Sequence, residues 1–148
     1  MIDDAIRFFR RHVRSVWRIE GSRRIEVPEY PEGVIRELLI NAVIHRSYLE
    51  GRDVTFQIFS DRVVMASPGC VPPPLTLEDL RAPVGPPSVR RNPLIADAFA
   101  RLERMELRAI GLPAVYEGLR RHGLRKPEFR EHANPLSAGR DRDFRPHP

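Results

Sequence analysis

The sequence predicts an α+β fold, a two-layer sandwich in which helices cover one face of a mixed, mostly antiparallel sheet. Two patterns support this expectation. Apolar and polar residues alternate from Val54 to Ile58, and after a turn at Ser60-Asp61 the apolar segment RVVMA returns the chain, as in an antiparallel hairpin; apolar residues recur with a period near 3.6 in segments before and after it. Helices and hairpin strands that are segregated along the chain are typical of the α+β class.

The composition describes one globular domain with tails. The 148 residues are 41% hydrophobic and 30% charged, which is ordinary for a protein with its own core. No apolar run approaches the roughly 20 residues of a membrane helix, and the N-terminus lacks the apolar core of a secretory signal. Cys70 is the single cysteine, so an internal disulfide and a cysteine-cluster metal site are excluded. We expect a cytoplasmic protein without membrane contact.

The net charge of +5 comes from the two ends of the chain. Residues 1–24 carry seven arginines against three acids, residues 119–148 carry eight basic residues against four acids, and the middle is acidic. Such ends could bind nucleic acid directly. The favoured alternative is a solvated basic surface, because the chain uses arginine almost exclusively.

Three regions follow from the patterns along the chain. Residues 1–24 are predicted to form a basic helix that packs on the main domain, with apolar residues at helical spacing over residues 2–17, the last of them Trp17. The main domain is predicted at residues 25–130, and it begins with a short strand in RRIEVPEY. The polar, patternless sequence of residues 131–148 predicts a disordered tail.

A central helix is predicted to begin at Pro31, since proline is favourable in a first helical turn. It is apolar almost all the way round, and its polar residues Glu37, Asn41 and His45 fall on one stripe because they are four residues apart. Polar groups on such a helix are costly unless they meet water, a ligand or polar partners. The spacing alone favours a helix with one hydrated face. The alternative is a pocket in which Glu37 orients or deprotonates a water and Asn41 offers an oxygen to a hard cation.

The remaining elements follow the hairpin, which ends at Ser67-Pro68-Gly69. Thr76 is predicted to cap a short helix, and the loop at residues 81–91 is rich in proline, glycine and arginine, a composition typical of functional loops. Asn92 and Pro93 are predicted to start the next helix. Its buried stripe is expected at Leu94, Ile95, Ala98, Phe99 and Leu102. A last helix is predicted to end at Gly123.

Several ordered blocks resemble a known family. IRELLINAVIHRSY is similar to the N-box helix of the GHKL ATPases, such as gyrase and the histidine kinases, whose pattern is E-x-x-x-N followed by a small residue. The hairpin ending in SPG, then LTLEDL, a variable loop and RNPLIADAFARL resemble, in that order, the GHKL-like domain found C-terminal to Schlafen-type AlbA_2 DNA-binding domains. Those proteins are labelled transcriptional regulators or ATP-dependent DNA helicases related to RecG. The resemblance covers roughly residues 5–130.

The resemblance implies a Bergerat-type fold with ATP between the helix layer and a lid loop. Asn41 matches the asparagine that holds Mg²⁺ on the phosphates, and Glu37 matches the carboxylate that activates the attacking water in members that hydrolyse ATP. The loop at residues 81–91 stands at the place of the lid. Arg90 and Arg91 would reach phosphates from it.

The adenine and phosphate loops depart from the family pattern. Ser67 and Gly69 stand where other GHKL proteins have D-x-G, so a neutral hydroxyl replaces the aspartate that reads the adenine amino group, while Gly69 would allow close approach of the base. Gly111 survives from the later glycine motif, but Ala109 and Ile110 replace a glycine and a small polar residue. This change argues for weakened or lost phosphate binding.

The resemblance therefore implies an ATP-binding domain of a DNA-associated transcriptional regulator, with Mg²⁺ and ATP as a conformational ligand and slow or no hydrolysis. The alternative is a degenerate, nucleotide-free module for dimerisation or interaction in a split or truncated regulator. Helicase activity is excluded because the P-loop pattern that holds phosphate in helicases is missing. The implied partners are ATP, an AlbA_2-type DNA-binding domain or chain and a second copy in a homodimer. DNA is expected to be bound only indirectly or through the Arg-rich ends.

Overall fold

The computed structural model describes residues 1–82, 89–106, 111–133 and 140–145, with side chains described except at 103–106 and 132–145. The helices are α1 (Ile2–His12), α2 (Glu32–Ile44), α3 (Leu77–Arg81), α4 (Pro93–Glu106) and α5 (Gly111–Arg121). The strands are β1 (Ser15–Glu20), β2 (Arg23–Pro28), β3 (Thr55–Ile58), β4 (Val63–Pro68), β5 (Glu128–Ala133) and β6 (Arg140–Arg145).

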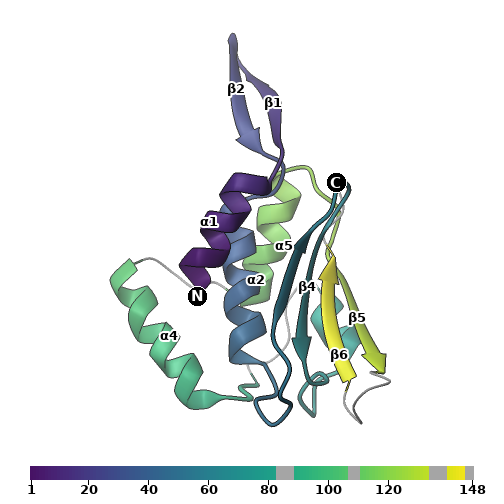
Figure 1. Ribbon diagram of the computed structural model, residues 1–148. Helices are drawn as coiled ribbons and strands as arrows, with labels where there is room; N and C mark the ends of the chain where they lie inside the picture. The colour runs from purple at the N-terminus through teal and green to yellow at the C-terminus, as the bar shows by residue number, and fades with distance from the viewer. Residues whose placement is uncertain (83–88, 107–110, 134–139, 146–148) are drawn as a thin grey trace.

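The main body is a helix layer against a four-stranded sheet. The sheet has the order β3-β4-β6-β5, and each neighbouring pair of strands is antiparallel. Helices α1, α2 and α5 lie side by side next to this sheet (Figure 1). The prediction of an α+β fold with a mostly antiparallel sheet is confirmed. The hairpin between residues 54 and 66 is also confirmed, as strands β3 and β4.

Helix α2 lies at the centre of the core because it is apolar on nearly all sides. It begins after Pro31, as predicted, and Ile35 has no exposed surface. Its neighbour α5 approaches closely at Gly118, where a Cβ atom would lie only 2.6 Å from Cγ2 of Val34. The side chains buried around α2 are Ile6, Phe9, Tyr30, Val63, Met65, Val115 and Leu119.

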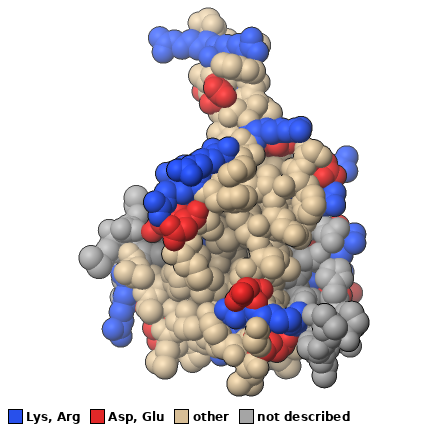
Figure 2. Space-filling view, in the orientation of Figure 1, with Lys and Arg blue, Asp and Glu red and all other residues tan. Residues whose placement is uncertain are grey.

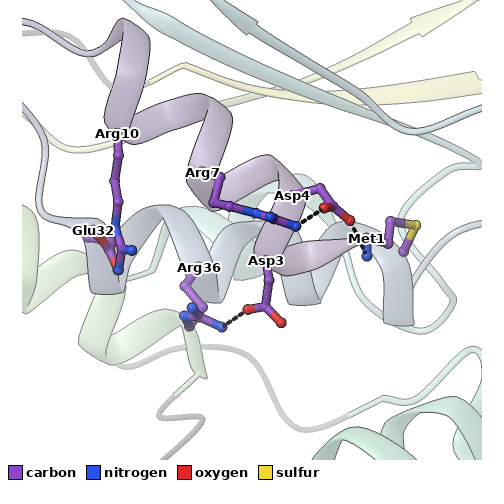
Figure 3. A network of polar contacts seen from close by, with 7 residues as sticks. All are labelled: Met1, Asp3, Asp4, Arg7, Arg10, Glu32 and Arg36. Atoms are coloured by element: carbon purple, nitrogen blue, oxygen red, sulfur yellow. Dashed lines mark hydrogen bonds and ion pairs between the residues drawn. The ribbon is translucent and has the colours of Figure 1, made fainter.

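Helix α1 packs on α2 through two buried apolar residues and two ion pairs. Ile6 and Phe9 are each 1% exposed. Arg10 binds both carboxylate oxygens of Glu32 at 2.6 and 2.7 Å, and Arg36 reaches Asp3 at 3.2 Å (Figure 3). Hydrogen bonds from Arg10 lower the pKa of the Glu32 carboxyl from its usual value. The predicted packing of an N-terminal helix is therefore present, but the helix ends at His12 and not at residue 17.

The chain beyond α1 forms a hairpin of two strands that were expected in different elements. β1 pairs with β2 over six residues, and the hairpin extends away from the helices and the sheet (Figure 1). The predicted strand in RRIEVPEY is confirmed as β2. The helical prediction for Val16 and Trp17 is wrong, and Trp17 is 57% exposed. The backbone turns at Gly21 with a φ of +60°, a conformation that glycine adopts readily, and the turn lets the chain fold back and pair.

Helix α4 starts at Pro93 as predicted, but it presents a different face to the body. Leu94 is 85% and Leu102 is 61% exposed, and Ala98 is exposed too, whereas Ala96 is buried. The expected stripe is therefore partly wrong. Apolar residues surround this helix, so its sequence alone does not decide which side packs, and α4 contacts mainly α2 at the edge of the body (Figure 1).

The C-terminal residues add two strands to the sheet. The expectation of a disordered tail from residue 131 does not hold for β5 and β6, which pair with each other and extend the sheet from β4. Their register sets residues of opposite charge across from one another, Arg130 against Asp143 and Glu131 against Arg142. Phe129 of β5 is buried in the core and anchors these strands to the body. Residues 134–139 and 146–148 lie outside the described residues.

Candidate functional site

The polar stripe of α2 meets the start of α5. Glu37 is only 9% exposed, and its carboxylate oxygen Oε1 accepts hydrogen bonds from Nδ2 of Asn41 at 2.9 Å and from the backbone N–H of Gly111 at 3.1 Å. The structure therefore brings Glu37, Asn41 and Gly111 together, three residues that the sequence analysis assigned to one site. A carboxylate at a helix N-terminus is favourable because that end carries a partial positive charge.

The hydrogen bonds of Asn41 fix the orientation of its amide. Nδ2 donates to the backbone carbonyl of Glu37 at 2.9 Å as well as to its side chain, and both of these atoms are acceptors. The NH₂ group must therefore face Glu37, so the oxygen Oδ1 points the other way. Within the described part of the chain, Oδ1 accepts no hydrogen bond. This oxygen is available to a hard cation, which prefers carbonyl and carboxylate ligands.

Ser67 connects the end of β4 to the last turn of α2. The side chain is 5% exposed, and its hydroxyl donates to the carbonyl of Ala42 at 2.8 Å. The backbone N–H of Ser47 donates to the carbonyl of Pro68 at 2.7 Å and holds the same two elements together. Because the hydroxyl hydrogen of Ser67 is directed to Ala42, its oxygen can act towards a further group only as an acceptor.

Gly69 lies directly after Ser67 and Pro68 and permits a close approach that no other residue would allow. Its φ is +102°, and a Cβ atom at this position would lie 2.1 Å from Nη1 of Arg91 and 2.9 Å from Cβ of Ser47. Arg91 itself donates from Nη2 to the carbonyl of Cys70 at 2.5 Å. Ser67, Gly69 and Arg91 thus form a second group of predicted site residues beside the last turn of α2.

Two neighbouring residues behave differently from the expectation. Arg90 forms an ion pair with Asp97 of α4 at 2.7 Å, with both side chains about half exposed, so its side chain is directed to α4. Nδ2 of Asn92 donates to the carbonyls of Ile44 and Arg46 at 2.7 and 2.8 Å. Asn92 therefore closes the C-terminus of α2, a role that the sequence analysis missed. Its place beside Pro93 suggested only a cap for the following helix.

The predicted site residues thus surround the C-terminal half of α2 in two groups. One contains Glu37, Asn41 and Gly111, and the other contains Ser67, Gly69 and Arg91. Ala109 and Ile110, which carried the argument for a weakened phosphate loop, lie outside the described residues. Within the described part of the chain, no cluster of three His, Cys, Asp or Glu side chains could hold a metal ion. A cation at Asn41 would accordingly need oxygens from a ligand such as a phosphate.

The sequence matches one family model over residues 51–138, more than half of the chain. The family, HATPase_c_4, is described as "Putative ATP-dependent DNA helicase recG C-terminal". The chain belongs to this family. It is therefore an ATPase-like domain, and membership implies the use of a nucleotide. The matched range contains Ser67, Gly69, Arg91 and Gly111, whereas α2 with Glu37 and Asn41 lies before it.

A solved structure has the same fold over nearly the whole chain. It is the crystal structure of the DIP2311 protein from Corynebacterium diphtheriae, with a TM-score of 0.78 and 26% sequence identity over 97% of this chain. The chain spans 28% of the length of that protein. No protein of curated function matches the sequence. Among the described helices, none has the length and apolar character needed to cross a membrane.

Proposed function

We propose that this domain binds an adenine nucleotide with Mg²⁺ beside the C-terminal half of α2, and that the nucleotide acts mainly as a conformational ligand. Hydrolysis is slow or does not occur. The single observation that carries the proposal is the fixed amide of Asn41, whose Oδ1 is turned away from Glu37. We place the domain in a cytoplasmic, DNA-associated transcriptional regulator, next to an AlbA_2-type DNA-binding domain or chain.

The residues present fit the two ends of a nucleotide. Gly69 has no Cβ atom, so a base could approach its backbone closely once the Arg91 side chain moves aside, and Ser67 offers an acceptor beside it for a base amino group. Arg91 packs on Gly69 and donates to the carbonyl of Cys70, and on moving from this position its guanidinium would be suited to phosphate oxygens. Asn41 would hold Mg²⁺ through Oδ1, and the ion would neutralise phosphate charge when bound.

The position of Glu37 supports the proposal of slow or absent hydrolysis. Its Oε1 accepts the N–H of Gly111 and the amide of Asn41, so the carboxylate holds α2 against α5. A general base needs a lone pair directed at the attacking water. The contacts on Oε1 tie the Glu37 carboxylate to α5 and so restrict the orientations in which it could meet a water, and this restriction favours binding over turnover.

The same contact supports a second candidate, a nucleotide-free interaction module. A helix N-terminus is a common place for a phosphate because its N–H groups are unpaired. At α5 the first N–H is already bonded to a carboxylate of the same chain. If Glu37 permanently takes the place of an anion there, the domain would work without a nucleotide.

Isothermal titration of the 148-residue chain with Mg·ATP distinguishes the two candidates. We expect saturable heat, and we expect Asn41→Ala to weaken binding by about tenfold or more, because a direct ligand of the cation is lost. Gln57→Ala, which removes an exposed amide on β3, is the matched control and should bind like the natural chain. The absence of heat at millimolar nucleotide, or equal binding by the Asn41 variant, would make the nucleotide-free module the correct function.

Glu37→Gln separates the roles of the carboxylate. If Glu37 acts as a base, the variant keeps nucleotide affinity and loses any phosphate release. If Glu37 takes the place of an anion at α5, the neutral variant binds Mg·ATP more tightly than the natural chain. Binding is measured by titration and phosphate release over hours on the same sample. The two measurements show which of these roles Glu37 has.

A further inference from the structure

The hairpin of β1 and β2 has one face that is turned away from the body. The register places Ile19 opposite Arg24 and Trp17 opposite Glu26, and these four side chains point to the same side because residues alternate along a strand. Trp17 is 57% and Ile19 is 77% exposed. Trp17 is the single tryptophan of the chain, and the guanidinium of Arg24 lies over its ring at 4.4 Å.

The other face of the hairpin is tied to the body. Arg18 donates to the carbonyl of His122 at 3.0 Å, and Nε2 of His122 lies 2.7 Å from the carbonyl oxygen of Pro28. Ile25 and Val27 on this face are half-buried. The hairpin is therefore anchored in a defined orientation, and the face with Trp17 is presented to its surroundings. Figure 2 shows the hairpin standing clear of the body, with side chains of both charges on it.

The free face is complementary to itself. Glu26 and Arg24 are two residues apart on β2, and neither forms an ion pair among the described residues. When a second copy of the face is turned about a two-fold axis that crosses the strands midway between these residues, Arg24 of each copy meets Glu26 of the other. The same rotation places Trp17 of each copy on Ile19 of the other. Reciprocal contacts of this kind define the interface of a two-fold dimer.

We propose that this face is a self-association surface and that its occupant is the hairpin of a second copy of this chain. Tryptophan and arginine are enriched at the centres of protein interfaces, where they contribute most of the binding energy. The face is small, because each strand has six residues. The dimer is therefore of the weak, reversible class, below the interface size of permanent dimers. This inference does not depend on nucleotide binding at α2.

Nucleic acid fits this face less well than a second copy. Arg23 and Arg24 near the turn would attract phosphates, but Glu26 lies on the same face as Trp17 and would repel them. Ile19 is an exposed aliphatic side chain with no role in phosphate or base-stacking contacts. The balanced charges of Arg24 and Glu26 are satisfied by a copy of the same face and not by a polyanion.

The fluorescence of Trp17 reports on association in the test of this proposal. Sedimentation equilibrium and tryptophan emission are measured together from about 5 μM to about 500 μM protein, a range that covers the weak affinities of small interfaces. We expect the mass to rise towards a dimer as the emission moves to shorter wavelength, because the indole leaves water. Ile19→Ala should weaken association, and melting by circular dichroism should show that the body remains folded. A constant monomer mass with constant emission would overturn the proposal.

Charge reversal identifies the geometry. Glu26→Arg should weaken association about tenfold or more, because the two-fold axis repeats the unfavourable contact. Adding Arg24→Glu in the same chain restores the complementary pairs and should restore the dimer. Arg101→Glu on α4 is the control for a change of charge elsewhere and should leave association unchanged. Failure of the double variant to recover would overturn the two-fold arrangement. A shift in emission with duplex DNA but not with protein concentration would make nucleic acid the occupant.

Discussion

The two hairpins of this protein, β1–β2 and β3–β4, have the same antiparallel pairing but opposite surroundings. In β4, Val63, Val64 and Met65 are buried because the strand lies between β3 and β6 and beneath α2. In β1, all residues except Arg18 are exposed. The first hairpin holds its shape mainly by its own backbone pairing, whereas the second is part of the core.

This difference explains why only one of the two hairpins was predicted in full. Alternation of apolar and polar residues reflects the burial of one face, and β3 carries it because Phe56 and Ile58 pack on the core. The hairpin of β1 and β2 buries little of either face, so its apolar residues need not alternate. Val16 and Trp17 therefore continued the helical spacing of α1 by coincidence.

The largest expected effect comes from the same substitution made in both regions. Ile35→Ala removes a side chain with no exposed surface, and we expect a loss of about 2–5 kcal/mol of unfolding free energy. Ile19→Ala, at 77% exposure, should change the stability of a dilute monomer by less than about 0.5 kcal/mol. Urea unfolding of the two variants measures the contrast. A large loss for Ile19→Ala would mean that the hairpin is part of the core.

A pair of glutamates gives the next largest contrast. Glu37→Ala leaves the amide of Asn41 and the N–H of Gly111 without their acceptor, and we expect a loss of about 2–3 kcal/mol. Glu26→Ala on the hairpin should be nearly neutral below micromolar concentration. The melting temperatures of the two variants measure this difference in stability. Equal, small effects would show that the contact between α2 and α5 does not depend on the carboxylate.

A smaller effect is expected where α4 leaves the body. Asn92→Ala removes two hydrogen bonds, to the carbonyl of Ile44 at the end of α2 and to that of Arg46 just after it, which should cost about 1–2 kcal/mol. Because these bonds anchor the start of α4, amide hydrogen exchange in α4 should accelerate more than exchange in α5. Unchanged exchange in α4 would mean that Ala96 and its neighbours hold the helix without Asn92.

The smallest effect concerns the partly exposed ion pair of α1. The pKa of Glu32 is lowered by Arg10, so the unfolded chain takes up the proton first on acidification. The contribution of the pair is present above the unfolded pKa of about 4.3 and is lost as the pH falls through the lower folded pKa. Glu32→Gln should be less stable than the natural chain by at most about 1 kcal/mol at pH 7. The two should melt alike in acid; a difference that persists there would have another cause.

The sequence was sufficient where one residue type decides a local structure. Pro31 and Thr76 marked the starts of α2 and α3, and the Thr76 cap is present, with its hydroxyl accepting from the N–H of Asp79 at 3.2 Å. The spacing of Glu37 and Asn41 was also sufficient to predict that they share a stripe. The spacing could not predict what each of them contacts, because Gly111, which bonds to Glu37, lies 74 residues further along the chain.

The sequence does not predict the structure where several packing arrangements are compatible with the same pattern of apolar residues. Helix α4 is apolar on more than one side, so the choice of Ala96 over Leu94 depends on how Asn92 fixes its start. β5 and β6 pair with each other, β6 also pairs with β4, and Phe129 of β5 joins the core, although the charged residues around it show no apolar pattern. In both cases the deciding contact joins segments that are distant in sequence, so the periodicity of apolar residues within one segment does not predict it.

The close approach at Gly118 has a consequence for how α5 can move. Two helices that are in contact at one point can still rotate relative to each other about that point. A second contact restricts this rotation. Gly118 against Val34 is the first point, and the N–H of Gly111 on Glu37 is the second. These two contacts hold α5 against α2 at Gly118 and at Gly111, together with buried side chains such as Val115 that pack in the same core. Without the contact at Gly111, the start of α5 would be held to the polar stripe by core packing alone.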